Sequence, residues 1–138
     1  MNECSFCECP RDIIVYQTKL SLSSIFLKSI KPGHLVVFSK RHVGKITDLN
    51  SKEIKDLFQL VQRLATTLNQ KLSEEKLYIL SIGDKDPHFH FHLIPRLKDE
   101  IKLGPYIFGE TGWRGNFINN LLSSEQEEIR NYIINNIK

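Results

Sequence analysis

The chain has 138 residues, of which 41% are hydrophobic and 25% charged, as in one ordinary globular domain. Its net charge of +3 suits an anionic ligand but is smaller than the basic footprint of a nucleic-acid-binding protein. Its apolar runs are too short to cross a membrane and it shows no apolar signal-peptide region, so we expect a cytoplasmic protein without a membrane partner.

The three cysteines, Cys4, Cys7 and Cys9, all lie in the first nine residues. An odd number of cysteines in one short segment is a poor disulfide framework. A Cys-x-x-Cys pair in an intracellular chain is more typical of half a metal site. The alternative is that Cys4 and Cys7 are reduced thiols in a loose terminal segment.

Short apolar or β-branched stretches at 13–18, 22–27 and 35–38 predict three strands. Residues 51–72 carry the clearest helical pattern, with apolar residues at steps of three and four positions. Asn50 and Glu53 have the spacing of a capping box in front of it. The apolar stripe of this helix consists of Ile54, Leu57, Phe58, Val61, Leu64, Ala65, Leu68 and Leu72.

Residues 77–82 and 88–95 predict two further strands, joined as a hairpin by a turn of about five residues. A last helix is expected from Ser123 or Ser124 towards Ile137. We therefore predict an α+β fold, an antiparallel meander of five strands with a long helix and a C-terminal helix.

No linker divides the chain, so residues 1–138 are expected to form a single domain. Its core is expected at 4–97, followed by a C-terminal tail and helix at 98–138.

Three of the five histidines alternate with apolar residues in the stretch 88–92. Because side chains alternate between the faces of a strand, His88, His90 and His92 are expected to share one face. Neutral imidazole can attack phosphorus, and a neighbouring imidazole can donate to the oxygens on which charge develops. The spacing alone also allows a metal site or a purely structural role.

These residues resemble the histidine triad (HIT) superfamily, whose motif alternates histidines with hydrophobic residues as 88–94 do here. Pro95-Arg96 after the motif is typical of its diadenosine polyphosphate hydrolase branch. Pro32-Gly33-His34 and the Cys4/Cys7 pair resemble two further family blocks. The resemblance extends over residues 4–97.

The resemblance implies a role for three histidines. His90 matches the nucleophile that forms a nucleotidyl-histidine intermediate, His92 the histidine that contacts the phosphate, and His34 a supporting histidine. It also implies purine nucleotide substrates cut at the α-phosphate. Homodimers whose two five-stranded sheets join into one ten-stranded sheet are usual in the family.

Some family members carry a structural zinc ion, and the matching ligands here are Cys4, Cys7, His42 and His88. Two thiolates and two imidazoles are a normal closed zinc set. Mg²⁺ is expected, if at all, only with the phosphates of the substrate.

The chain departs from the family in the turn before His88, which lacks the usual Gln and Ser or Thr. Lys85 in that turn is a candidate phosphate ligand, or a solvated turn residue. Trp113, in the Gly-rich segment after the motif, is a candidate for stacking on the base, or an ordinary loop residue. The family's ribose-binding Asn or Asp upstream of Pro32 is also missing.

Hydrolysis of a dinucleoside polyphosphate or related nucleotide conjugate is the leading hypothesis. A nucleotidyltransferase or phosphorylase would use the same residues with another acceptor. A nucleotide-binding module with little turnover, and a metal-binding protein that uses all the histidines, are the alternatives from other classes.

Overall fold

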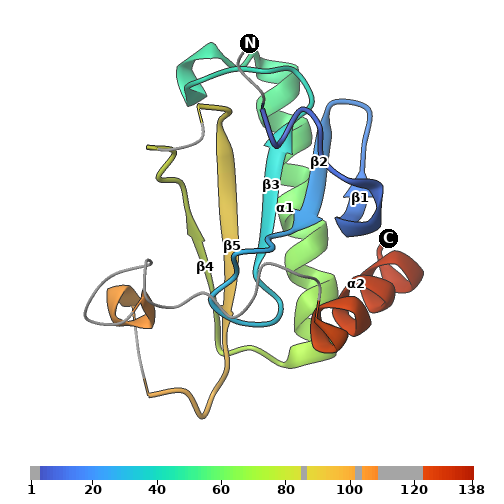
Figure 1. The fold of residues 1–138 in the computed structure, drawn as a ribbon, viewed down its shortest axis with the longest axis vertical. Coiled ribbons are helices and arrows are strands. Elements are labelled where there is room, and N and C mark those ends of the chain that lie inside the picture. Colours follow the sequence, from blue (N-terminus) through green and yellow to red (C-terminus); the bar gives the residue numbers. More distant parts are fainter. Residues whose placement is uncertain (1–3, 85–86, 102–103, 109–122) are drawn as a thin grey trace.

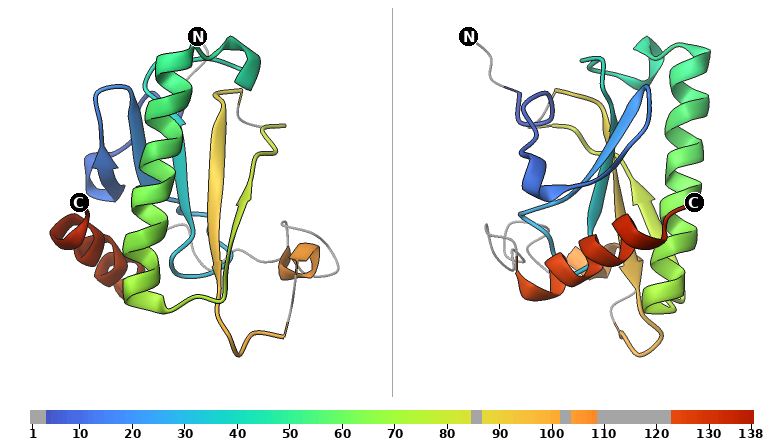
Figure 2. Two further views of the ribbon diagram at one scale, coloured as in Figure 1. Left: turned by 180° about the vertical axis from the view of Figure 1, so that it is seen from behind. Right: turned by 90° about the vertical axis from the view of Figure 1, so that its right-hand side faces the viewer.

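The computed structural model describes residues 4–84, 87–101, 104–108 and 123–138. They form a five-stranded sheet with a long helix, α1, against one face (Figure 1). Seen from behind, α1 lies in front of the sheet (Figure 2, left). Seen from the side, the N-terminal segment lies on the opposite face of the sheet from α1 (Figure 2, right). The α+β architecture expected from the sequence is confirmed.

The sheet is antiparallel throughout, in the spatial order β1-β2-β3-β5-β4. Because β5 pairs antiparallel with both β3 and β4, those two strands run in the same direction, and α1 makes the crossover between them. The predicted meander is therefore wrong for the last two strands, because β5 and not β4 lies beside β3. The strand that carries the histidines is thus an interior strand of the sheet. The strands are β1 (Ile14–Gln17), β2 (Ser21–Ile25), β3 (Leu35–Ser39), β4 (Lys76–Leu80) and β5 (His90–Arg96).

Helix α1 (Ser51–Leu72) begins at the predicted capping box. The backbone N–H of Glu53 donates to the Asn50 side chain at 2.9 Å, and the Asn50 N–H donates to Glu53 Oε1 at 3.0 Å. Its buried face packs on the sheet and includes the fully buried Leu57, Leu60, Leu64 and Leu68. Ile54 and Phe58, predicted in the same stripe, stay 37% and 45% exposed.

Helix α2 (Ser124–Asn136) packs beside α1 and β1 and buries Ile129 and Ile133. The buried Gln126 side chain donates to Ser29 Oγ at 2.7 Å, which ties α2 to the loop between β2 and β3. Among the described residues, neither helix combines the length and apolar character that a membrane span requires. Three 3₁₀ turns complete the secondary structure of the described residues: Arg11–Ile13, Ile46–Asp48 and Gly104–Phe108.

The predicted hairpin between the last two strands is longer than expected. β4 ends at Leu80 and β5 begins at His90, so the sequence placed His88 in the strand too early. The physical reason is that the backbone before His90 bonds elsewhere: the Phe89 N–H donates to the Val43 carbonyl at 2.7 Å.

Candidate functional site

His90 and His92 lie on the face of β5 that is turned away from α1, and His34 approaches from the residue before β3. The rings of His90 and His92 have centroids 4.8 Å apart, and those of His92 and His34 are 5.1 Å apart. All three side chains are almost completely buried. The structure thus brings together the three histidines that were predicted to act on a substrate, whereas His88 turns to another cluster.

A chain of hydrogen bonds connects these rings. His34 Nε2 lies 3.0 Å from His92 Nδ1, His92 Nε2 lies 3.1 Å from His90 Nε2, and His90 Nδ1 lies 2.8 Å from the His88 carbonyl oxygen. At the other end, the Ile30 N–H donates to His34 Nδ1 at 3.3 Å.

The two backbone groups at the ends of this chain determine every tautomer. A carbonyl oxygen only accepts, so His90 Nδ1 carries a proton and, in a neutral ring, His90 Nε2 carries a lone pair. His92 Nε2–H then donates to that lone pair, and His34 Nε2–H donates to His92 Nδ1. The backbone N–H at Ile30 agrees, because it requires an acceptor at His34 Nδ1.

Burial keeps His92 and His34 neutral. Desolvation, followed by the charge of His90, lowers the pKa of His92 to about 3. Burial, followed by the neighbouring His92, lowers the pKa of His34 well below its ordinary value of 6.5. A row of neutral imidazoles that ends in a directed lone pair can deliver a nucleophile and, from the next ring, a hydrogen-bond donor.

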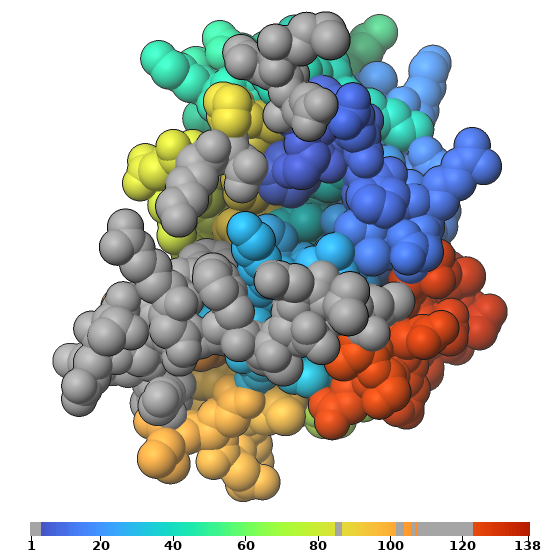
Figure 3. Space-filling view, in the orientation of Figure 1, coloured from blue at the N-terminus to red at the C-terminus, as the bar shows by residue number. Residues whose placement is uncertain are grey.

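An apolar floor adjoins the row on the same face of the sheet. Phe6, Val36 and Phe38 form its buried part, and Phe26 packs against it with its ring centroid 4.9 Å from those of His34 and His92. The space-filling view shows the N-terminal segment, in dark blue, on this face beside the yellow residues that lead into β5 (Figure 3). Neither Phe6 nor Phe26 is predicted from the sequence, although the place of Phe6 between two candidate metal ligands is a usable signal.

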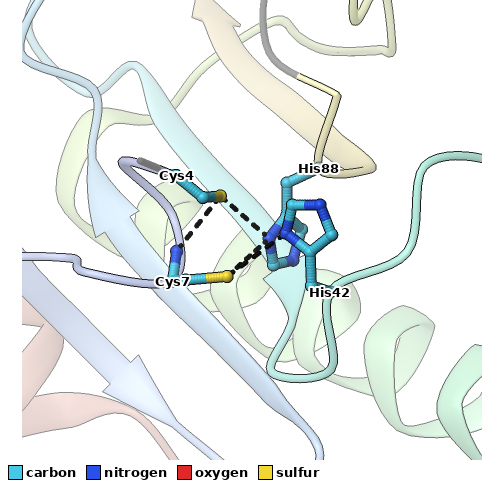
Figure 4. Close-up of side chains that lie close together, drawn as sticks. All are labelled: Cys4, Cys7, His42 and His88. Carbon is cyan, nitrogen blue, oxygen red and sulfur yellow. Dashed lines mark hydrogen bonds between the residues drawn. The ribbon is translucent and has the colours of Figure 1, made fainter. Parts of the chain in front are cut away.

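Cys4, Cys7, His42 and His88 form a second cluster at the end of the sheet from which β5 begins (Figure 4). Their ligand atoms all lie within 4.8 Å of one another. Cys7 Sγ lies 3.3 Å from His42 Nδ1 and 3.5 Å from His88 Nδ1, and Cys4 Sγ lies 3.4 Å from His88 Nδ1. The predicted metal ligands are therefore brought together.

The donor set fits a tetrahedral metal ion. With ordinary Zn–S and Zn–N bond lengths, a sulfur and a nitrogen on the same tetrahedron are about 3.5 Å apart, close to the three distances above. His88 Nε2 donates to the Ser39 carbonyl at 2.7 Å, which leaves Nδ1 with the lone pair that faces the thiols.

The loop that carries His42 is fixed to the start of α1. Arg41 donates from two nitrogens to the buried Glu53 carboxylate, at 2.9 and 2.7 Å, and Ser39 Oγ donates to the Arg41 carbonyl at 2.8 Å. The hydrogen bond from Arg41 is the main cause that lowers the pKa of Glu53. This pair holds the backbone next to a candidate ligand.

The loop that carries His34 approaches β5 closely at Gly33. Its φ of +91° is in the region that favours glycine, and a Cβ atom would lie 2.9 Å from Pro95 Cγ and 3.0 Å from Leu72 Cδ1. The glycine of the Pro-Gly-His sequence therefore lets this loop pack against the histidine strand. Lys85 and Trp113, the predicted phosphate and base contacts, lie outside the described residues.

Comparison with known proteins gives a consistent result. The family model described as "HIT domain" matches residues 9–99. A bis(5'-nucleosyl)-tetraphosphatase (asymmetrical) of Schizosaccharomyces pombe is 32% identical over 102 residues, which are 70% of this chain and 56% of that protein. A bis(5'-adenosyl)-triphosphatase of Dictyostelium discoideum is 29% identical over 102 residues, 70% of this chain and 68% of that protein. The chain thus spans about half to two thirds of the length of these relatives.

Among solved structures, a Zn-bound histidine triad family protein from Mycobacterium smegmatis has the same fold, with a TM-score of 0.71. It is 18% identical, and the match covers 96% of this chain and 91% of that one.

Proposed function

The chain belongs to the HIT domain family, and on that premise we propose that it hydrolyses dinucleoside polyphosphates or related nucleotide conjugates at the α-phosphate. The products are a nucleoside monophosphate and the remaining nucleotide. Two relatives named as diadenosine or dinucleoside polyphosphate hydrolases support this substrate class. The observation that carries the proposal is the hydrogen-bond chain that leaves a lone pair on His90 Nε2, beside the N–H of His92.

In the first step, His90 Nε2 attacks the α-phosphorus, and the bond from phosphorus to the bridging oxygen breaks. The His90 Nδ1–H keeps its hydrogen bond to the His88 carbonyl, and this bond stabilises the positive charge that forms on the ring. His92 Nε2–H, released from His90, is in place to donate to the phosphate oxygens or to the departing oxygen.

In the second step, water attacks the same phosphorus and the P–N bond breaks. The electron pair returns to His90 Nε2 and the monophosphate leaves. The proton from water goes to solvent, or to His92 where that ring has given its own proton to the departing oxygen. One water is consumed for each substrate, and the neutral row of the resting protein is restored.

We further propose that Cys4, Cys7, His42 and His88 hold a structural Zn²⁺ ion. Three sulfur–nitrogen distances of 3.3–3.5 Å, close to those of a tetrahedral site, and the Zn-bound family structure support this. The ion would tie the N-terminal segment to the residue that precedes the catalytic strand. The need for reduced thiols favours the cytoplasm as location.

We propose a homodimer in which two sheets join at β4. In the part of the chain that the structure describes, this strand is one of the two edges of the sheet, and Ile79 on it is 48% exposed. Ile79 pairs with Leu93, which packs under α1, so it lies on the same face as the exposed Ile54 and Phe58 of that helix. An unpaired edge next to exposed apolar side chains favours pairing with a second copy.

Two contacts rest on the sequence alone. Lys85 is proposed to bind the substrate phosphates and Trp113 the base. Mg²⁺ would enter with the polyphosphate and not through protein ligands.

The test is rapid quenching of the protein with diadenosine tetraphosphate, followed by mass spectrometry of the peptide that contains residues 88–96. We expect a nucleotidyl adduct on His90, no adduct in His90→Asn, and ¹⁸O from labelled water in the released AMP. An adduct on another residue, or AMP release by His90→Asn at the wild-type rate, would contradict the mechanism. Formation of ADP in the presence of phosphate would instead indicate a phosphorylase.

A further inference from the structure

We infer that Phe6 is a positioning residue for His90, and that the cluster of Cys4, Cys7, His42 and His88 holds Phe6 in that position. The inference rests on the proposed function for its catalytic consequence, but its structural part can be tested without turnover. Phe6 would not touch the reacting atoms. It would act by restraining the plane of the nucleophilic ring.

The ring of Phe6 lies against the flat side of the imidazole of His90. Their centroids are 4.5 Å apart with an angle of 33° between the planes, the shortest of the ring contacts that Phe6 makes. Phe6 is itself held by Phe38, at 4.8 Å, and by the edge of His88, at 5.7 Å. Only 8% of Phe6 is exposed, so it is a packed side chain.

His90 needs such a restraint during the reaction. In the resting protein, it has hydrogen bonds at both nitrogens, to the His88 carbonyl and to His92. When Nε2 attacks phosphorus, the hydrogen bond from His92 is lost. The remaining hydrogen bond at Nδ1 does not by itself prevent the ring from rotating. A ring packed against its face opposes that motion and keeps Nε2 aligned with the phosphorus.

The position of Phe6 in the sequence connects it to the metal cluster. It lies between Cys4 and Cys7, whose sulfur atoms both lie within 3.5 Å of His88 Nδ1. His88 in turn supplies the carbonyl that holds His90. The cluster therefore fixes both restraints on His90. One is the His88 carbonyl, which accepts from Nδ1, and the other is the ring of Phe6, which packs on its face.

The kinetic test compares Phe6→Leu with Tyr132→Leu, which removes an aromatic ring from helix α2, where it lies beside Lys71. For Phe6→Leu we expect kcat to fall by about 10- to 100-fold with KM changed less than about threefold. Phe6→Tyr, which keeps the ring, should retain most of kcat, and Tyr132→Leu should match the wild type. A tenfold rise in KM at unchanged kcat would overturn the inference, because it would make Phe6 a substrate contact.

The structural test is NMR of the imidazole groups in the protein without substrate. The ring protons of His90 should lose the upfield ring-current shift in Phe6→Leu and keep it in Tyr132→Leu. Cys7→Ser should produce the same loss, and the combined Phe6→Leu/Cys7→Ser variant should lose less kcat than the product of the two single effects. Unchanged His90 resonances in Phe6→Leu would overturn the inference whether or not the protein hydrolyses dinucleotides, and multiplicative losses would overturn the link to the cluster.

Discussion

His90 Nδ1 lies 2.8 Å from the backbone carbonyl oxygen of His88, whose own ring faces the thiols of Cys4 and Cys7. One residue thus belongs to two sites, with its side chain in the metal cluster and its backbone in the histidine row. Because the carbonyl only accepts, it orients His90 with Nε2 free of a proton.

Replacing His34 should slow the reaction without preventing folding. The Nε2–H of His34 donates to His92 Nδ1 and so keeps the proton of His92 on Nε2. His34→Gln moves that donor, so the His92 Nε2–H no longer has a fixed direction. We expect kcat for diadenosine tetraphosphate to fall by about 10- to 100-fold. Long-range ¹H–¹⁵N spectra should show a mixture of His92 tautomers, and a single Nε2–H tautomer in the variant would contradict the relay.

Acid should destabilise the protein through the buried row. The pKa of His92 is about 3 in the folded protein and 6.5 in the unfolded chain. Below about pH 6.5, the unfolded chain therefore binds a proton that the folded protein does not bind. Stability should therefore fall as pH decreases from about 6.5 towards 3. From pH 7 to pH 5 this group alone removes about 2 kcal/mol.

His34 acts in the same direction, since burial lowers its pKa too. Urea unfolding at the two pH values measures the loss, and His92→Gln should lose about 2 kcal/mol less than the wild type over this interval. An equal loss in both proteins would show that His92 is not the group responsible.

The Glu53 carboxylate should control metal affinity from outside the ligand set. Glu53→Gln removes the charge that holds Arg41, next to His42, but a glutamine can still complete the capping box of α1. We expect Zn²⁺ affinity, measured by competition with a chelator, to fall about tenfold or more. Glu128→Gln removes an exposed ion pair with Lys71 and serves as the control, with unchanged affinity.

Gly33 should tolerate alanine worse than Gly104. Both have positive φ, +91° and +57°, but a Cβ at Gly33 would meet Pro95 and Leu72, whereas a Cβ at Gly104 meets nothing within 4 Å. We expect Gly33→Ala to lower the free energy of unfolding by about 2 kcal/mol or more, and Gly104→Ala by about 1 kcal/mol. Urea titration of both variants separates the effect of the backbone angle from that of the contact, and equal losses would count against the close packing.

Ile79 should control assembly. Ile79→Lys places a charge on the free edge of β4, which should convert the proposed dimer to a monomer in sedimentation velocity experiments. Ile134→Lys, at a similarly exposed isoleucine on α2, should leave the dimer intact. A dimer that survives Ile79→Lys would move the interface away from this edge.

The sequence predicted those features that depend on short-range patterns. The capping box at Asn50 and Glu53, the span of α1 and the existence of all five strands follow from local periodicity and turn residues. The Cys-x-x-Cys spacing indicated two of the metal ligands, and the family resemblance supplied His42 and His88. The order of the last two strands could not be predicted locally, because it depends on how the crossover through α1 returns to the sheet.

Two errors have the same origin. The alternation predicts His88 in the strand, yet its ring bonds to Ser39 at the end of β3 and the backbone of Phe89 bonds to Val43 in the loop that follows. Phe6 was not recognised because its contact with His90 joins residues 84 positions apart in the chain. Alternation describes a strand but does not say where tertiary hydrogen bonds end it.

The place of β5 between β3 and β4 also bears on how the protein loses activity when heated. An interior strand cannot detach by local fraying, because its amide groups are bonded on both sides. Its amides should be among the slowest to exchange with deuterium, at a rate set by global opening of the domain. The alignment of His90 and His92 should then persist up to the midpoint of thermal unfolding, so that activity and tertiary structure are lost in a single transition.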